Sequence, residues 1–311
     1  MATTKEPPPF GIYTPVVIFF HDDETIDFES TSQHVQRLLL AGVRGLVIHG
    51  SNGEATHMLP DERVDTIRHV KALIQEKDSK AVIIAGCSAN SVREVLLNID
   101  TACEAGADYA LILPPNYWAA AMTKPVIKTF YLEVARKSAL PIVIYNFPAV
   151  VSSIDLDSDL ITELATSSSN IVGVKLTCGN VGKLQRISAS TSNEKFVPLA
   201  GKSDFLLPAL VAGSSGAIAA LANVVPKVHV HVLQLYAAGD LAKAQDIQKS
   251  LALADWALAK YGISGVKTVC QKWFGYGTGM VRAPLPVVDV VGLSKDLELR
   301  LQCLIDMELS L

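Results

Sequence analysis

The chain has 311 residues, of which 50% are hydrophobic and 19% are charged, as is usual for a globular protein with a large core. This length fits one α/β barrel of about 250 residues together with an extension. The formal net charge is −4 and the sequence has no basic cluster, so we expect neither nucleic acid nor an anionic membrane as a partner.

Five cysteines without CxxC spacing indicate reduced thiols and a cytoplasmic protein. The segment 1–9 is polar and proline-rich, without the apolar core of a signal peptide or the arginines of a transit peptide. The uncharged segment 205–226 is long enough to cross a membrane, but Pro208, Pro226 and the glycine turn 213–216 interrupt it. We therefore predict a helix, a turn and a buried strand there, and no membrane span.

In chain order, eight short apolar runs are followed by apolar residues at helical spacing, such as Val64, Ile67 and Val70. Ala-Gly pairs at 41–42, 105–106 and 212–213 end three helical patterns shortly before a strand, where glycine is the usual left-handed terminator. The predicted strands are 12–20, 45–49, 81–86, 109–113, 141–146, 171–176, 196–200 and 216–220.

This alternation of strand and helix predicts an α/β fold, the (β/α)8 or TIM barrel. A doubly wound open sheet is the main alternative, but no GxGxxG follows the first strand, which disfavours its dinucleotide-binding form. After Asn223 the strand runs stop, and helices are predicted at 225–238, 240–261, 266–276 and 294–310. We therefore predict a barrel over 1–223 and a C-terminal helical extension over 224–311.

The sixth predicted strand, 171–176, contains Lys175 among apolar, small and β-branched residues, a pattern typical of a strand buried on both faces. A buried cation is costly unless it is paired or neutral, and no carboxylate occurs within four residues. One interpretation is a lysine at a strand end whose ammonium reaches water. The other is an amine kept partly uncharged, which attacks a carbonyl and forms a Schiff base.

Polar residues at the ends of other strands could complete a site for this amine, because chemistry in a barrel gathers at the C-terminal ends of its strands. The second strand is followed by Gly50-Ser51-Asn52-Gly53-Glu54, which could bind an anion or form a plain tight turn. The fifth strand ends at Tyr145, whose phenol could move protons or only pack. Tyr117 and Trp118 follow the fourth strand as rim aromatics.

Three weaker sites also have to be considered. His229 and His231 have the spacing of ligands on one strand face, but they fall in a helical pattern without a further ligand. His49 and His57 flank the 50–54 turn and could support a metal-dependent aldolase. The turn 213–216 could bind a phosphorylated substrate, or pyridoxal phosphate on the lysine, although a plain turn is favoured.

The sequence resembles the dihydrodipicolinate synthase / N-acetylneuraminate lyase superfamily of class I aldolases, from about Tyr13 to the C-terminal helices. The matching motifs, in order, are Gly50-Ser51-Asn52-Gly53-Glu54, Pro115-Asn116-Tyr117, Tyr145-Asn146-Phe147-Pro148 and Gly173-Val174-Lys175-Leu176-Thr177. The resemblance implies a (β/α)8 barrel with Lys175 as the Schiff-base residue and Tyr145 as the proton carrier. It implies a small keto-acid substrate and neither metal nor organic cofactor, because the protonated imine replaces a Lewis acid.

The resemblance also implies roles for further residues. Ser51 and Asn52 would hold the carboxylate of pyruvate, and Thr177 sits where the lyase branch contacts substrate. Tyr117 would reach the site of a neighbouring subunit, which implies a homotetramer built from dimers. Gly201 and Ile218 fall where the family lines the pocket.

Two departures from the family pattern bear on the substrate. Enzymes of lysine biosynthesis in this superfamily grip the second substrate's carboxylate with an arginine, where this sequence has Val150. This substitution argues against a dihydrodipicolinate synthase. Asn52 replaces a usual threonine, so a hydroxyl relay between Tyr145 and Tyr117 would have to run through Ser51.

Within the superfamily, the motifs SNGEA, YNFP and GVKLTCGN look most like those of fungal 2-keto-3-deoxy-L-galactonate (L-threo-3-deoxy-hexulosonate) aldolases. Those enzymes cleave a 2-keto-3-deoxy sugar acid to pyruvate and L-glyceraldehyde. Alternatives are a 4-hydroxy-2-oxoglutarate aldolase and a dihydrodipicolinate synthase-type condensation of pyruvate with aspartate semialdehyde. A barrel that only binds a keto acid, without catalysis, is the alternative from another class.

Overall fold

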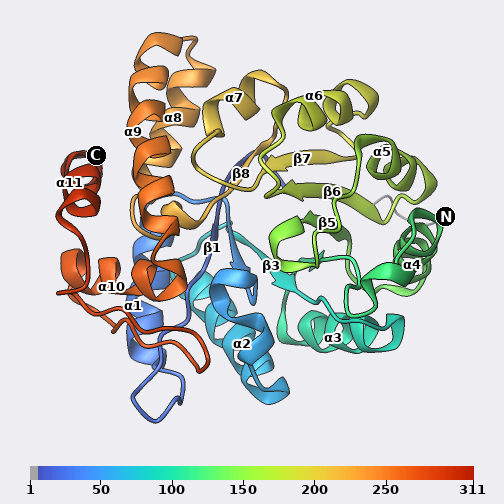
Figure 1. Ribbon diagram of the computed structural model, residues 1–311, viewed down its shortest axis with the longest axis horizontal. Helices are drawn as coiled ribbons and strands as arrows, with labels where there is room; N and C mark the ends of the chain where they lie inside the picture. Colours follow the sequence, from blue (N-terminus) through green and yellow to red (C-terminus); the bar gives the residue numbers. More distant parts are fainter. Residues whose placement is uncertain (1–5) are drawn as a thin grey trace.

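In the computed structural model, which describes residues 6–311, eight parallel strands close into a barrel in sequence order, β1 to β8 (Figure 1). The predicted (β/α)8 barrel is therefore confirmed. The sequence-based expectation for the N-terminal segment falls partly on residues 1–5, which lie outside the described residues. The strands are β1 (Gly11–Pro15), β2 (Gly45–Ile48), β3 (Val82–Gly86), β4 (Tyr109–Ile112), β5 (Ile142–Asn146), β6 (Ile171–Leu176), β7 (Val197–Ala200) and β8 (Gly216–Ile218).

The first strand is shorter than predicted, because β1 ends at Pro15 although the apolar run continues to Phe20. Beyond Val16 the backbone leaves the barrel wall, and the N–H of Val17 donates to the side-chain oxygen of Asn223 at 3.2 Å. The residues 16–20 are nevertheless buried. Continuous apolar sequence therefore predicts burial here, but not strand pairing.

Eight helices cover the outside of the barrel and follow the strands in turn. The predicted glycine terminators are confirmed, because Gly42, Gly106 and Gly213 have φ of 79°, 104° and 92°. At the start of α3, the Ser91 hydroxyl accepts the N–H of Glu94. The helices are α1 (Phe28–Leu40), α2 (Pro60–Glu76), α3 (Val92–Ala105), α4 (Lys124–Lys137), α5 (Ser158–Ser167), α6 (Val181–Ser190), α7 (Leu206–Val211) and α8 (Pro226–Ala237).

Three further helices form a layer on one side of the barrel: α9 (Leu241–Ala259), α10 (Gly262–Phe274) and α11 (Lys295–Ser310) (Figure 1). Helix α8 packs on β1, and α9 packs on α8 and α11. Helix α10 begins at Gly262 rather than at the predicted 266, so it includes Gly262 and Gly265 despite their low helix propensity. The division of the chain into 1–223 and 224–311 stays a prediction.

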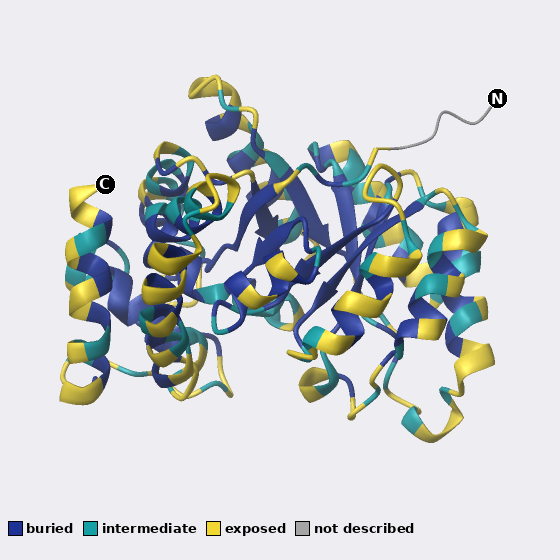
Figure 2. Cartoon of the chain, turned by 90° about the horizontal axis from the view of Figure 1, so that it is seen from above, coloured by how far each residue is buried: buried dark blue, intermediate teal, exposed yellow. Residues whose placement is uncertain are grey.

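Two apolar cores hold the fold together, and the buried barrel strands that contribute to both are dark in Figure 2. One lies between the barrel and its helices, and a smaller one fills the barrel interior with side chains that include Val47, Leu111, Val143 and Ile218. Within 6–311, no helix combines the length and apolar character that crossing a membrane requires. The segment 205–226 forms α7, a turn and β8, as predicted.

Candidate active site

A cavity of about 340 Å³, here called the lysine pocket, lies at the C-terminal end of the barrel strands. Seven of the eight predicted site residues line it. A larger cavity of about 680 Å³, here called the His49 pocket, adjoins it and shares Ser51, Tyr145, Val150 and Ile263 with it. The predicted residues in the lysine pocket are Ser51, Asn52, Tyr145, Lys175, Thr177, Gly201 and Ile218.

Lys175 lies on β6 with only 2% of its surface exposed, so the interpretation of a lysine reaching water at a strand end is wrong. Its Nζ is 4.2 Å from the centroid of the Tyr145 ring, because the two residues are register partners on β5 and β6. The buried lysines Lys183 and Lys267 each pair with a carboxylate. No such ion pair involves Lys175 within residues 6–311, so its amine lines the cavity without a carboxylate in ion-pair contact.

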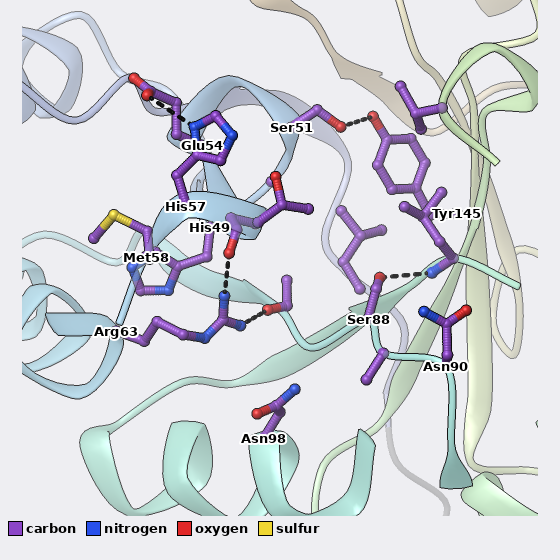
Figure 3. Close-up of a pocket in the computed structure, with 18 of the residues that line it drawn as sticks. His49, Ser51, Glu54, His57, Met58, Arg63, Ser88, Asn90, Asn98 and Tyr145 are labelled. Carbon is purple, nitrogen blue, oxygen red and sulfur yellow. Dashed lines mark hydrogen bonds and ion pairs between the residues drawn. The ribbon is translucent and has the colours of Figure 1, made fainter. Parts of the chain in front are cut away.

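The Tyr145 hydroxyl lies 3.4 Å from the Ser51 hydroxyl, across the mouth of the barrel (Figure 3). Ser51 and Asn52 belong to a single 3-10 turn, Ser51–Gly53, directly after β2. The sequence therefore brings a phenol, a hydroxyl and an amine from three different strand ends into one pocket. Either hydroxyl can donate to the other, so a proton can pass between them.

The far wall of the lysine pocket depends on a glycine. A Cβ on Gly201 would come within 2.3 Å of the Thr177 Oγ1 and 2.5 Å of its backbone nitrogen. The Thr177 hydroxyl contacts the Gly201 carbonyl at 3.5 Å, and Ile218 of the barrel-interior core lines the same pocket. Only glycine allows β7 to approach the end of β6 this closely.

Tyr117 is the predicted site residue that the structure does not bring to the others. Its side chain is 76% exposed, and it packs edge-on against Trp118 with ring centroids 5.3 Å apart. It lines neither cavity of the single chain. Its predicted role in a neighbouring subunit's site stays a prediction.

The histidine pair on α8 and the turn 213–216 both have structural roles. His229 is buried on α8 and contacts the Val225 carbonyl at 2.7 Å and the Ser203 hydroxyl at 2.9 Å, whereas His231 faces Gln234. The turn 213–216 precedes β8 and lies at the opposite end of the barrel from the lysine pocket. There the Ser214 hydroxyl donates to backbone carbonyls, as in a plain turn.

His49 and His57 line the His49 pocket, but they do not converge on a metal site (Figure 3). Burial and the nearby Arg63 guanidinium hold the pKa of His49 well below its ordinary value. His57 Nδ1 is 3.7 Å from a carboxylate oxygen of Glu54. Within the part of the chain that the structure describes, no three His, Cys, Asp or Glu side chains are grouped for a metal ion.

A family model described as the dihydrodipicolinate synthetase family matches residues 8–296. The chain belongs to this family. It is 41% identical over 286 residues to an L-threo-3-deoxy-hexylosonate aldolase of Hypocrea jecorina, covering 89% of this chain and 90% of that protein. It is 40% identical over 270 residues to a protein of Emericella nidulans named as a probable mitochondrial 4-hydroxy-2-oxoglutarate aldolase, with 86% of each chain covered.

Solved structures agree with this membership. A dihydrodipicolinate synthase family protein from Coccidioides immitis superposes with a TM-score of 0.88 at 36% identity, covering 99% of this chain and 100% of the other. YagE from Escherichia coli K12, crystallised in complex with pyruvate, gives a TM-score of 0.86 at 28% identity, covering 95% and 98%. The resemblance stated from the sequence motifs is therefore confirmed.

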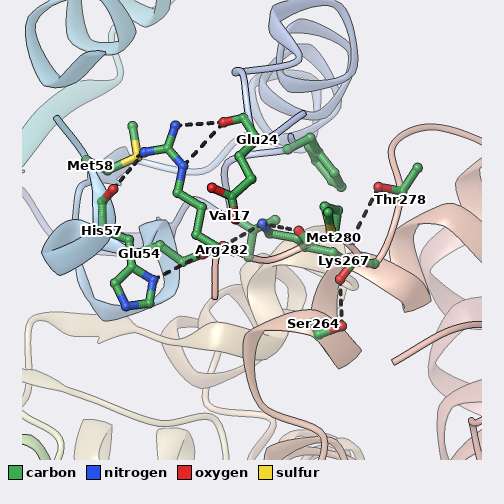
Figure 4. A network of polar contacts seen from close by, with 12 residues as sticks. Val17, Glu24, Glu54, His57, Met58, Ser264, Lys267, Thr278, Met280 and Arg282 are labelled. Carbon is green, nitrogen blue, oxygen red and sulfur yellow. Dashed lines mark hydrogen bonds and ion pairs between the residues drawn. The ribbon is translucent and has the colours of Figure 1, made fainter. Parts of the chain in front are cut away.

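This family member also contains a buried network that the sequence analysis missed (Figure 4). Lys267 on α10 donates to the Glu54 carboxylate at 2.6 Å and to the Met280 carbonyl at 2.7 Å, and both charged side chains are fully buried. The N–H of Arg282 donates to the other Glu54 oxygen at 2.9 Å. Burial lowers the pKa of Lys267 to about 8, and the Glu54 carboxylate opposes this shift.

The network fixes the turn that carries Ser51 and Asn52. Glu54 ends this turn with φ 50° and ψ 40°, a left-handed conformation that costs a non-glycine residue free energy unless contacts stabilise it. The Arg282 guanidinium binds the Glu62 carboxylate and the carbonyls of His57 and Glu24. The segment after α10, which contains Arg282, therefore connects the turn after β2 to the C-terminal helices.

Proposed function

We propose that the protein is a class I aldolase that cleaves a 2-keto-3-deoxy sugar acid, L-threo-3-deoxy-hexulosonate, to pyruvate and L-glyceraldehyde. The observation that carries this proposal is the buried amine of Lys175, which faces the pocket beside the Tyr145 ring without an ion pair in 6–311. The name of the Hypocrea jecorina relative supports the choice of substrate.

The proposed reaction begins when the Lys175 amine attacks the C2 ketone of the substrate. Loss of water gives a cationic imine, which withdraws electrons from the C3–C4 bond. Tyr145 removes the proton of the C4 hydroxyl, the C3–C4 bond breaks, and the aldehyde leaves. The remaining enamine is protonated at C3, and hydrolysis of the imine releases pyruvate and restores the amine.

In this scheme, Ser51 and Asn52 bind the substrate carboxylate, and Thr177 contacts the keto-acid half. The 3.4 Å contact between the Ser51 and Tyr145 hydroxyls gives the phenol a route for passing its proton on. Neither a metal nor an organic cofactor takes part, because the protonated imine already serves as the electron acceptor.

Borohydride reduction in the presence of pyruvate tests the proposal. The imine should be reduced to a stable adduct, and peptide mass mapping should place this adduct on Lys175. Lys267 and Lys183 are matched internal controls, because they are equally buried but paired with carboxylates. If the folded protein gives no adduct at Lys175, the proposed function is wrong, and the alternative of a silent keto-acid-binding barrel gains support.

The main alternative substrate is 4-hydroxy-2-oxoglutarate, which the name of the Emericella nidulans relative supports. A dihydrodipicolinate synthase-type condensation is less favoured, because the apolar side chain of Val150 lines the pocket where a carboxylate-binding arginine would be needed. Pyruvate release from the two keto acids, and condensation of pyruvate with aspartate semialdehyde, should be compared at equal enzyme concentration. The proposed substrate should give the highest kcat/KM.

The homotetramer and the cytoplasmic location are further parts of the proposal. The adjacent exposed rings of Tyr117 and Trp118 support a subunit contact at the barrel rim. Light scattering of the purified protein should give the mass of four chains, and Tyr117→Ala should lower it. Because two relatives are named as mitochondrial, a fluorescent fusion imaged with a mitochondrial marker is needed to test the location.

A further inference from the structure

A buried amide lies next to Tyr145 at the end of β5. Asn146 is the last residue of this strand and is fully buried. Because successive side chains of a strand point to opposite faces, Asn146 points away from the barrel interior, which Tyr145 helps to fill. A buried amide is costly unless its polar atoms have partners. The partners of Asn146 therefore show what this residue holds in place.

Asn146 connects the end of β5 to two other segments of the chain. Its side-chain oxygen accepts the N–H of Leu156 at 3.0 Å, and its amide nitrogen donates to Oδ1 of Asp155 at 2.7 Å. Its backbone carbonyl accepts the N–H of Thr177 at 3.0 Å. Asn146 thus fixes the end of β5 both to the end of β6 and to the loop 147–157 that leads into α5.

A buried lysine on α6 completes a chain of polar contacts. The Lys183 ammonium binds the same Oδ1 of Asp155 that accepts from Asn146, and the Lys183 side chain is only 4% exposed. Lys183 lies in the first turn of α6, where the helix end carries a partial positive charge that disfavours a cation. The ion pair with Asp155 offsets this cost and fixes the carboxylate that orients Asn146. The three residues are here called the Asn146 chain.

The loop that the Asn146 chain anchors also lines the lysine pocket, through Phe147 and Val150. The outer part of this loop has only long contacts to Asn116, whose amide donates to the Val150 carbonyl at 3.3 Å and whose carbonyl accepts from the Ser152 hydroxyl at 3.4 Å. The contacts at Asn146 are shorter and more buried. The base of the loop is therefore held more firmly than its outer part.

We propose that the Asn146 chain positions the Tyr145 phenol beside the Lys175 imine, so that the phenol reaches the C4 hydroxyl of the substrate. Tyr145 and Lys175 are register partners on the two strands whose ends Asn146 joins. The members of the chain line neither cavity, so they act through Tyr145 and are positioning residues. This inference rests on the proposed function, because it uses the role of Tyr145 in that reaction.

Lys183→Met tests the inference, since it removes the ammonium group and keeps the length of the side chain. For L-threo-3-deoxy-hexulosonate, kcat should fall about 10- to 100-fold, because small displacements of a reacting group are costly. The Lys175 adduct trapped with pyruvate and borohydride should form as in the wild type. Lys183→Arg keeps the cation and should restore most of kcat. Lys124→Met is the matched control and should keep kcat, because Lys124 is 70% exposed and pairs with Asp157 at the end of the same loop.

A double variant separates positioning from a general loss of structure. If the Asn146 chain acts through the phenol, Lys183→Met should lower kcat no further in a Tyr145→Phe protein. If the two losses multiply instead, the inference is overturned. Should Lys183→Met fail to fold, Asp155→Ala takes its place with the same expected results, because the Asp155 side chain is 48% exposed and contributes less to packing.

Trapping with pyruvate distinguishes failure of the inference from failure of the proposed function. If the wild type and Lys183→Met form the Lys175 adduct equally and have the same kcat, the inference is overturned and the proposed function stands. If the wild type forms no adduct, the proposed function is overturned and the inference with it. A folded Lys183→Met protein that loses the adduct contradicts a role through Tyr145, because the imine forms before the phenol acts.

Discussion

Replacing Lys267 by methionine should destabilise the fold and the turn after β2 that carries Ser51 and Asn52. The substitution keeps the length of the side chain and removes the ammonium group that binds Glu54 at 2.6 Å and the Met280 carbonyl at 2.7 Å. The Glu54 carboxylate then stays buried with only the N–H of Arg282 and the nearby His57 ring to compensate its charge. Removing one partner of such a buried pair costs about 3–5 kcal/mol of the free energy of unfolding.

The same substitution should weaken the binding of pyruvate. Glu54 ends the turn that carries Ser51, and without Lys267 its left-handed conformation loses its main stabilising contact. The concentration of pyruvate that gives half-maximal borohydride adduct should therefore rise by about tenfold or more, because small displacements of binding groups are costly. The chemical step is affected less, since Lys175 and Tyr145 belong to strands outside this network.

Denaturant unfolding at pH 7 and the trapping assay should be carried out on the variant and on two comparisons. Lys249→Met removes an exposed ion pair and should cost less than about 1 kcal/mol. The double variant Glu54→Gln, Lys267→Met leaves no unpaired charge, so its loss should be smaller than the sum of the single losses. If Lys267→Met is no less stable than Lys249→Met, or binds pyruvate normally, the reasoning about this network is refuted.

Three single substitutions test other parts of the structure. Tyr145→Phe should lower turnover about 10²-fold or more while the pyruvate adduct still forms, and normal turnover would remove it from the proposed role. Gly201→Ala should lower the free energy of unfolding by about 1–3 kcal/mol, because its Cβ would lie 2.3 Å from the Thr177 hydroxyl; unchanged stability by denaturant unfolding would contradict this. Burial raises the pKa of Glu308 to about 7, so its protonated form stabilises the fold below about pH 4.5, and this contribution is lost as the pH rises through about 7. The free energy of unfolding of Glu308→Gln, measured in urea, should therefore change less over this pH range than that of the wild type. Parallel pH profiles of the two proteins would contradict the raised pKa of Glu308.

The barrel itself was predictable from the sequence, because strands buried on both faces leave continuous apolar runs and helix ends leave local signals. Strand β6 and the glycine terminators agree with the predictions. The end of β1 was not predictable, since a long-range contact from Asn223 draws the chain out of the wall at Val17. Local composition predicts which residues are buried, whereas strand pairing depends on contacts with residues that are distant in the sequence.

The same distinction separates the site residues that the sequence predicted from those that it did not. Ser51, Tyr145 and Lys175 follow or end strands, and the barrel rule alone brings the C-terminal ends of strands together. Lys267 lies in the run Val266–Cys270, where a charge among apolar residues was the available signal, but nothing local connects it to Glu54 more than 200 residues earlier. No comparable rule predicts from the sequence which residues of the C-terminal helices contact the barrel.

The two halves of the lysine pocket therefore have different origins. The half around Lys175 and Tyr145 is built from strand ends, whose relative position the closed barrel fixes. The half around Asp255 and Ile263 is built from α9 and α10, which pack on the barrel from outside. Substitutions on these helices can change the shape and charge of this half of the pocket without moving the Lys175 amine. On this basis, the identity of the aldehyde should follow the residues on these two helices, while the pyruvate half of the reaction stays the same.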